Sequence, residues 1–338
     1  MAAYIDEDLN DPEEYFTAFL WTGDGTSPRS ITGVGFQANM MWSKIRDTGH
    51  EHSLVDTVRG VDNKRLKPDA AAAEDTNNTH GHFDSLDSDG FTLTGASGYW
   101  NVNTNTKDYV GWFWKESATS GFDIVSYTGN DTAGREISHS LSAVPKMIIV
   151  KDRNGADSWV VYHGSLAVTQ YLILNDTNAA LSDNEVVFYD TAPTSSVFTV
   201  GAHGVVNEAS DNYIAYCFAE KQGFSKFGSY DGNGLDSGNG PFVYTGFRPA
   251  FFMLKEADNA DNWIIMDNKR LGYNKRNDHL FPNLNSAEYA TDRIDIVSNG
   301  IKIIDSDGAI NTSGSTYVYA AFAESPFVNS NGVPNNAR

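Results

Sequence analysis

Tyr-Val-Gly-Trp-Phe-Trp-Lys-Glu, at residues 109–116, is a pattern that returns twice in this chain of 338 residues. It reappears as Tyr-Ile-Ala-Tyr-Cys-Phe-Ala-Glu at 213–220 and as Tyr-Val-Tyr-Ala-Ala-Phe-Ala-Glu at 317–324, with the leading tyrosines 104 residues apart both times. Self-similarity at a fixed period is the sequence signature of a repeat architecture. We therefore divide the chain into an acidic N-terminal arm (1–14), a C-terminal tail (327–338) and three repeats between them, at 15–118, 119–222 and 223–326.

Other residues recur in register with this pattern. Each tyrosine follows an asparagine by six residues, each pattern ends in a glutamate, and an earlier strand in each repeat ends in a lysine. These positions are Asn103, Asn207 and Asn311, then Glu116, Glu220 and Glu324, then Lys44, Lys151 and Lys255. Eight residues after the lysine come His52, Trp159 and Trp263. Several columns in one register indicate true repetition.

Each repeat has the pattern of a β structure. Apolar runs of four to eight residues are rich in Val, Ile, Tyr, Phe and Trp, and turn-forming Gly, Asn, Asp and Ser separate them. In 213–219 both alternating faces are apolar, which predicts a strand buried on both sides. We predict an all-β fold of three tandem antiparallel β-sandwich or jelly-roll-like repeats of about 104 residues. Because this length can bury a core of its own, we expect independently folded units.

Composition excludes several classes of function. The chain has 44 Asp+Glu against 24 Lys+Arg, a net charge of −20, which argues against nucleic acid or an anionic membrane as a partner. No apolar run approaches the ~18 residues of a membrane span. The single cysteine, Cys217, allows no intrachain disulfide. The acidic residues 1–14 do not have the pattern of a signal peptide.

Several phrases resemble a repeat domain of uncharacterised virion structural, tail-fibre-like proteins from marine tailed bacteriophages. They include Val-Ser-Tyr-Thr-Gly-Asn at 125–130, Pro-Lys-Met-Ile-Ile-Val-Lys at 145–151 and Tyr-Thr-Gly-Phe-Arg-Pro at 244–249. The resemblance covers about 15–326 and carries no catalytic residue. It implies a non-enzymatic protein, made in the host cytoplasm, on the virion exterior as a fibre, appendage or head decoration. Its implied partners are other virion proteins and copies of itself, a trimer by analogy with phage fibres. We expect the arm to anchor it to a neighbouring subunit.

Two alternatives to a purely structural role remain open. One is a lectin-like module that recognises a host surface glycan during attachment. Exposed aromatics would then stack on sugars, and the candidates are Tyr99, Trp100, Tyr273 and Tyr289. The other is a polysaccharide depolymerase, which would need a pair of carboxylates about 5–9.5 Å apart. No residue pattern singles out such a pair.

The remaining candidate sites involve charged side chains. We expect each recurring lysine to contact the glutamate of its own repeat at a sheet edge. Two His-x-His pairs could each offer two imidazoles to a metal, and they are His50 with His52 and His80 with His82. Acidic turns at 84–90, 231–234 and 305–308 offer oxygens for structural Ca²⁺, although the same residue types are what β-turns require.

Overall fold

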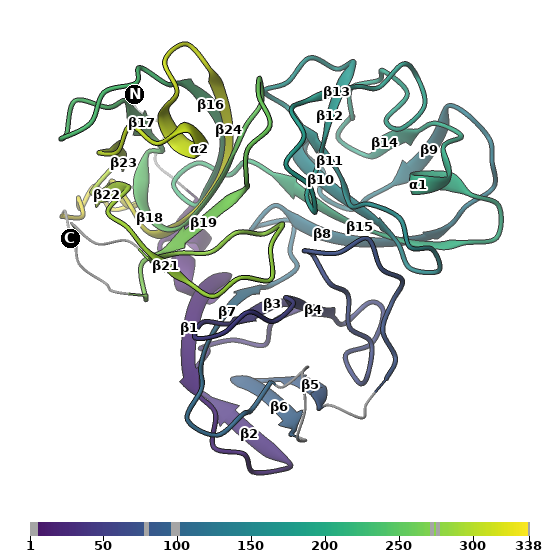
Figure 1. The fold of residues 1–338 in the computed structure, drawn as a ribbon, viewed down its shortest axis with the longest axis horizontal. Coiled ribbons are helices and arrows are strands. Elements are labelled where there is room, and N and C mark those ends of the chain that lie inside the picture. Colours follow the sequence, from purple (N-terminus) through teal and green to yellow (C-terminus); the bar gives the residue numbers. More distant parts are fainter. Residues whose placement is uncertain (1–5, 78–80, 96–101, 271–273, 275–277, 337–338) are drawn as a thin grey trace.

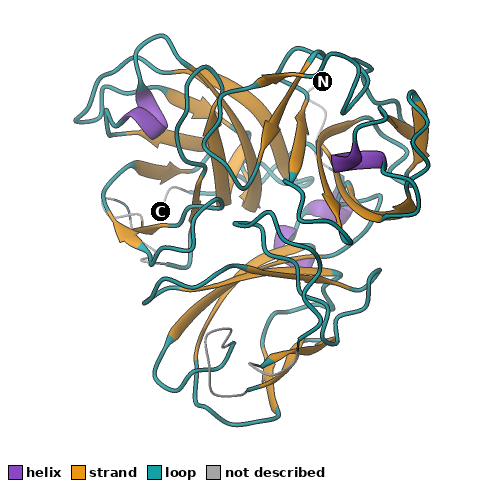
Figure 2. Cartoon of the chain, turned by 45° about the vertical axis from the view of Figure 1, so that its right-hand side comes forward, coloured by secondary structure: helices purple, strands orange, loops and turns teal. Residues whose placement is uncertain are grey.

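The computed structural model describes residues 6–77, 81–95, 102–270, 274 and 278–336. It is an all-β protein of antiparallel sheets, which confirms the all-β, antiparallel part of the prediction (Figure 1). The few helices of the described residues are short and lie outside the sheets, either before the first strand or in loops between strands (Figure 2). They are the 3₁₀ helices η1 (Glu7–Leu9) and η2 (Pro12–Glu14) and the α-helices α1 (Gly204–Asn207) and α2 (Gly308–Asn311). No helix in the described part of the chain is long and apolar enough to cross a membrane.

Three main sheets form the framework. The first sheet, ordered β1-β7-β3-β4, contains β1 (Phe16–Thr22), β3 (Met40–Ile45), β4 (Ser53–Asp56) and β7 (Asp108–Trp114). The second, ordered β13-β12-β11-β10-β15-β8, contains β8 (Phe122–Thr128), β10 (Pro145–Asp152), β11 (Val160–His163), β12 (Gln170–Ile173), β13 (Leu181–Ser182) and β15 (Asn212–Ala219). The third, ordered β16-β24-β18-β19, contains β16 (Ser225–Asp231), β18 (Phe247–Glu256), β19 (Ile264–Asp267) and β24 (Thr316–Pro326).

Smaller sheets accompany the main ones. The sheet ordered β2-β6-β5 contains β2 (Arg29–Thr32), β5 (His82–Asp87) and β6 (Gly90–Thr94), and β9 (Arg135–Ser138) pairs with β14 (Val197–Val200). The sheet ordered β17-β23-β22 contains β17 (Phe242–Tyr244), β22 (Ile294–Val297) and β23 (Gly300–Ile303), and β20 (Asp278–His279) pairs with β21 (Tyr289–Ala290).

One apolar core contains side chains from all three main sheets. Phe16 and Trp114 enter it from the first sheet, Phe218 from the second, and Phe251 and Phe322 from the third. The ring centroid of Trp114 lies 6.4 Å from that of Phe218 and 5.7 Å from that of Phe251. Each main sheet therefore buries one face against the other two, so the three segments share a core and are not separate beads. Whether a segment folds alone stays a prediction.

The opposite face of each main sheet has a separate core. In β15, Ile214, Tyr216 and Phe218 point into the shared core, whereas Tyr213 and Cys217 belong to a core made only of residues from the second segment. This confirms the predicted burial of both faces. Burial raises the pKa of the Cys217 thiol well above its usual value, as expected for a small apolar core residue.

The described parts of the two terminal segments are hydrogen-bonded to each other. Asn10 Nδ2 donates to Ser330 Oγ at 2.6 Å, and the Ser330 backbone N–H donates back to Asn10 Oδ1 at 2.8 Å. Leu9 of the arm is buried in the shared core. Residues 6–14 therefore pack on their own chain through Leu9 and Asn10, and the expectation that the arm anchors a neighbouring subunit stays a prediction.

Candidate functional site

The recurring lysines are buried at the ends of β3, β10 and β18, where they cap turns. Lys44 Nζ donates to Ile45 O at 2.7 Å and to Thr48 O at 3.3 Å. The equivalent contacts join Lys151 to Asp152 O and Gly155 O, and Lys255 to Glu256 O and Asn259 O. Burial lowers the pKa of all three ammonium groups to about 8. Each ammonium therefore donates to the carbonyl of the last residue of its strand and to one carbonyl in the turn that follows.

The predicted contact between each lysine and the glutamate of its own segment is wrong. Strand register places Lys44 opposite Val110. Glu116 lies six residues beyond Val110 along the chain, which is about 20 Å from Val110 at the usual rise of a strand. The same register separates Lys151 from Glu220 and Lys255 from Glu324. The glutamates instead contact the backbone of the following strand or a nearby cation. Glu116 accepts a hydrogen bond from the Ile124 N–H, Glu220 forms an ion pair with Lys226, and Glu324 forms one with Arg248.

The three segments are joined by ring N–H groups at one recurring position, which His52, Trp159 and Trp263 occupy. Each of these buried side chains reaches a backbone carbonyl of another segment, and the three contacts close a ring: second to first, third to second, first to third. The pairs are Trp159 Nε1 to Lys67 O (2.9 Å), Trp263 Nε1 to Ile173 O (2.8 Å) and His52 Nε2 to Phe281 O (3.1 Å). Backbone hydrogen bonds join the same three pairs of segments with donor and acceptor exchanged, from Glu74 N to Arg153 O, Ala180 N to Ala257 O and Glu288 N to Arg46 O.

We call the three places where two segments contact each other joints. Two of these three joints also contain buried ion pairs. Between the third and first segments, Arg270 Nε lies 2.7 Å from Asp267 Oδ2, and the indole N–H of Trp112 donates to the same oxygen at 3.0 Å. Between the first and second, Arg59 pairs with Asp56, and the Tyr216 hydroxyl donates to Asp56 at 2.7 Å. The Asp and Arg of each pair lie three residues apart in one segment, 12 and 15 residues after the recurring lysine, so this Asp-x-x-Arg spacing was the available signal. Only Trp112 and Tyr216, from the neighbouring segments, carried no such signal.

His52 is excluded as a metal ligand by these contacts. Its Nδ1 accepts from the indole N–H of Trp42 at 2.9 Å, so Nε2 carries the proton and donates to Phe281 O and Leu284 O. Both ring nitrogens are therefore occupied, and the predicted His50–His52 metal pair is wrong. Burial holds the pKa of His52 well below its usual 6.5.

Replacing His52 by glutamine is expected to weaken the loss of stability in acid. Glutamine can still accept from Trp42 and donate to Phe281, but it does not titrate. In the wild type the folded pKa is lowered, so below about pH 6.5 the unfolded chain binds a proton that the folded chain does not, and stability falls as pH falls. Between pH 7 and 5 the variant should lose about 2 kcal/mol less free energy of unfolding than the wild type. Urea denaturation at each pH measures this difference.

His50→Gln is the matched control for that experiment. His50 is half-buried, and its pKa is lowered less than that of His52. Its replacement should leave the acid dependence close to that of the wild type. An unchanged pH dependence in His52→Gln would contradict the assigned tautomer and burial.

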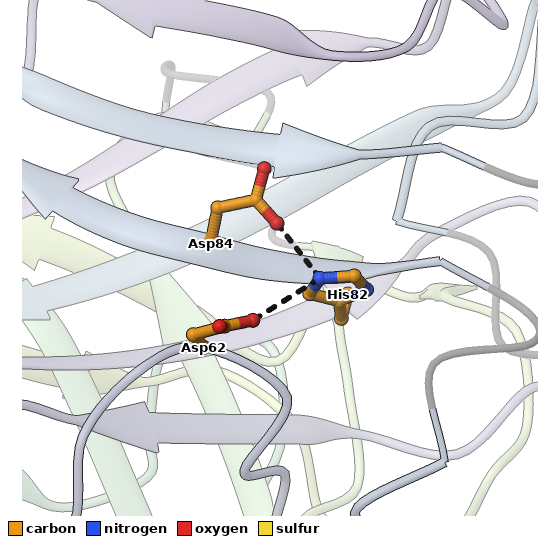
Figure 3. Close-up of side chains that lie close together, drawn as sticks. All are labelled: Asp62, His82 and Asp84. Carbon is orange, nitrogen blue, oxygen red and sulfur yellow. Dashed lines mark ion pairs between the residues drawn. The ribbon is translucent and has the colours of Figure 1, made fainter.

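The second predicted histidine pair leads to a different cluster. His82 on β5 lies 2.8 Å (Nε2 to Oδ1) from Asp84 on the same strand and 3.3 Å from Asp62 Oδ1, in the loop after β4 (Figure 3). One ligand atom from each residue lies within 4.8 Å of the others. His80 lies outside the described residues. Sequence spacing pointed to His82 and to the acidic turn that begins at Asp84, but not to Asp62.

The acidic turns in the described residues act mainly as turn and cap residues. Asp307 Oδ1 accepts from Ala309 N at the start of α2, and Arg293 Nη1 lies 2.9 Å from both Asp305 Oδ2 and Asp307 Oδ1. Asp231 Oδ1 accepts from the Thr316 hydroxyl at the end of its strand pair. Arg293 thus already pairs with both carboxylates of this turn, which disfavours Ca²⁺ there.

Of the four predicted sugar-stacking aromatics, Tyr289 is the one that lies in the described residues. Tyr99, Trp100 and Tyr273 lie outside the described residues. Tyr289 is 52% exposed and stacks on His279, with ring centroids 5.8 Å apart. Sequence reasoning missed Phe242 and Tyr244 of β17, which are 48% and 58% exposed. Their alternation with a buried valine was the available signal, since residues i and i+2 share one face of a strand.

Fold and contacts together define the class: an all-β protein in which three antiparallel sheets enclose one apolar core and ring-forming contacts join them. Residues 11–326 match the model of a family described as a domain of unknown function, DUF7483. Because this match covers most of the chain, the protein belongs to that family. No curated protein and no solved structure matches the sequence.

Proposed function

We propose that this chain is a non-enzymatic structural component of a tailed-phage virion, on the exterior as a fibre, appendage or head decoration. The observation that carries the proposal is the ring of joints around a shared core, which makes the three segments one body. Such a body resists force and proteolysis because no segment can open without exposing apolar surface. The resemblance of 125–130 and 145–151 to phage virion proteins supplies the context.

The finer part of the proposal is that 15–118, 119–222 and 223–326 are three copies of one structural unit. The three main sheets share one strand order. The first strand of each segment pairs with its last strand, the last strand pairs with the strand that bears the recurring lysine, and that strand pairs with the one that follows it in the chain. In each segment the recurring asparagine accepts from a turn N–H, as Asn207 does from Asn130 at 3.0 Å. Aromatic pairs stack at matching places: Trp21 with Tyr109, Tyr127 with Tyr213 and Tyr230 with Tyr317.

The surface would then present contacts to other virion proteins. A net charge of −20 suits an exterior protein that must not adhere to the phage genome. Assembly of copies into a homotrimer stays part of the proposal by analogy with phage fibres.

Locating the protein in purified particles tests this function. An antibody raised against the recombinant chain and labelled with gold should decorate the outside of intact virions, at the tail or over the head. Absence of the protein from washed particles would refute the proposal. If the label falls on the tail and the recombinant protein blocks phage adsorption, a role in host attachment is supported.

A second candidate function, glycan binding, is favoured by Phe242 and Tyr244. The two exposed rings lie on one face of the edge strand β17, as a surface that stacks on sugars requires. Binding of the recombinant protein to host surface polysaccharide should then be lost in the double variant Phe242→Ser, Tyr244→Ser. Val144→Ser, at an exposed apolar side chain of the second segment, is the control. Equal binding by both variants would exclude this face.

A further inference from the structure

We propose that Asp62, His82 and Asp84 bind a divalent first-row transition-metal ion, at a site that the virion function does not require. One imidazole and two carboxylates converge from two stretches of chain, the loop 57–62 and strand β5, as Figure 3 shows. A shared ion would tie that loop to the small sheet β2-β6-β5.

The spacing of the three groups fits coordination. Two ligands bound at about 2.1 Å and at right angles around one ion lie about 3.0 Å apart, and about 3.4 Å apart in tetrahedral geometry. Nε2 of His82 lies 2.8 Å from Asp84 Oδ1 and 3.3 Å from Asp62 Oδ1. An ion can therefore enter with small side-chain adjustments and without movement of the strand.

Charge and access also fit a cation. Two carboxylates and a neutral imidazole carry a charge of −2, which a divalent ion neutralises. Asp62 and Asp84 line an open groove of about 480 Å³ that also includes Thr57, Lys64 and Ser85. The side chain of Asp62 is 77% exposed, whereas that of His82 is only 17% exposed. The site is thus anchored from within by His82 and reached by solvent from the side of Asp62.

The ligand set selects the kind of ion. Imidazole suits zinc, copper, iron and nickel, and carboxylates suit manganese, magnesium and calcium, so a set with one nitrogen and two oxygens favours ions such as Zn²⁺ and Mn²⁺. Calcium requires six to eight oxygens, far more than these three side chains offer. Three protein ligands leave coordination positions for water on the groove side.

The competing explanation is an ion pair without metal, in which a protonated His82 bridges the two carboxylates. The two explanations differ in how substitutions act. Replacing an aspartate of a simple ion pair changes stability but not metal affinity. Replacing a ligand of a metal site lowers metal affinity and removes the stabilisation that metal gives.

Titration of the full-length protein with Zn²⁺ and Mn²⁺ after EDTA treatment tests the site. Isothermal calorimetry should give one ion per chain for the wild type, and Kd should rise more than about tenfold in His82→Gln and in Asp62→Asn. His50→Gln and Asp305→Asn are matched controls that should keep the wild-type Kd. Circular dichroism checks that each variant is folded, and Asp62→Asn, at an exposed position, keeps the test valid if His82→Gln unfolds.

Thermal unfolding supplies a second measurement. Metal that binds only the folded state stabilises it by RT ln(1 + [metal]/Kd), so the same excess of Zn²⁺ should raise Tm clearly more in the wild type than in Asp62→Asn. The proposal is overturned if neither ion binds at millimolar concentration, if the ligand variants bind as well as the wild type, or if Ca²⁺ binds in preference to both. A purely ionic cluster would give the first of these results without affecting the proposed virion function.

Discussion

Arg270→Ala is expected to lower the free energy of unfolding by about 3–5 kcal/mol, because it leaves a buried carboxylate without its cation. The side chain of Arg270 is completely buried, and so is that of Asp267, whose Oδ2 lies 2.7 Å from Arg270 Nε. Arg270 Nη1 also pairs with Glu288 at 2.8 Å, and Nη2 donates to Ile265 O. In the variant, Asp267 would keep its bond from Trp112 but lose the only guanidinium that is hydrogen-bonded to it in the described residues. Guanidinium denaturation followed by fluorescence measures the loss.

Lys226→Ala is the matched control for Arg270→Ala. The ion pair of Lys226 with Glu220 is equally short, at 2.7 Å, but its side chains are 35% and 30% exposed. Solvent screens an exposed pair, so its loss should cost no more than about 1 kcal/mol. If the two variants lost equal stability, the Arg270 cluster would be no more than a surface contact, and the assigned joint between the third and first segments would fail.

The sequence predicted those parts of the fold that depend on residues close to one another in the chain. Alternation of apolar residues in 213–219 predicted a strand buried on both faces, because a strand's side chains alternate whatever its surroundings. The recurring lysines were correctly seen as strand ends. Their partners were wrong, since a pattern of spacing does not show which end of the neighbouring antiparallel strand lies beside each residue.

Contacts between segments could not be predicted, because chain length alone suggested that each segment would bury its own core. His52, Trp159 and Trp263 were recognised as one column, but the carbonyls that they reach lie in other segments. The same limit applies to the candidate metal site. His82 and Asp84 stood out by their spacing, whereas Asp62, in a loop 20 residues before His82, carried no motif. Only tertiary structure brings it to the histidine.

A polypeptide of residues 119–222 alone is expected not to fold, which is the opposite of what an independent unit would do. In the intact chain one face of its sheet, including Met147, Trp159, Tyr216 and Phe218, is buried in the core that it shares with the first and third sheets. Excision would expose these large side chains to water at about 1.5–3 kcal/mol for each aliphatic or Phe side chain, which together exceeds the stability of a typical domain.

Circular dichroism and binding of a hydrophobic dye test this expectation on the isolated segment, with the full-length chain as the folded control. The fragment should show no cooperative thermal transition and should bind the dye. In the full chain, hydrogen exchange should give β10 and β15 the same opening free energy as β18 and β24, because one shared core requires all three sheets to open together. A fragment that melts cooperatively, or separate opening free energies for the three sheets, would restore the picture of independent units. The shared core would then be a contact between domains that are stable alone.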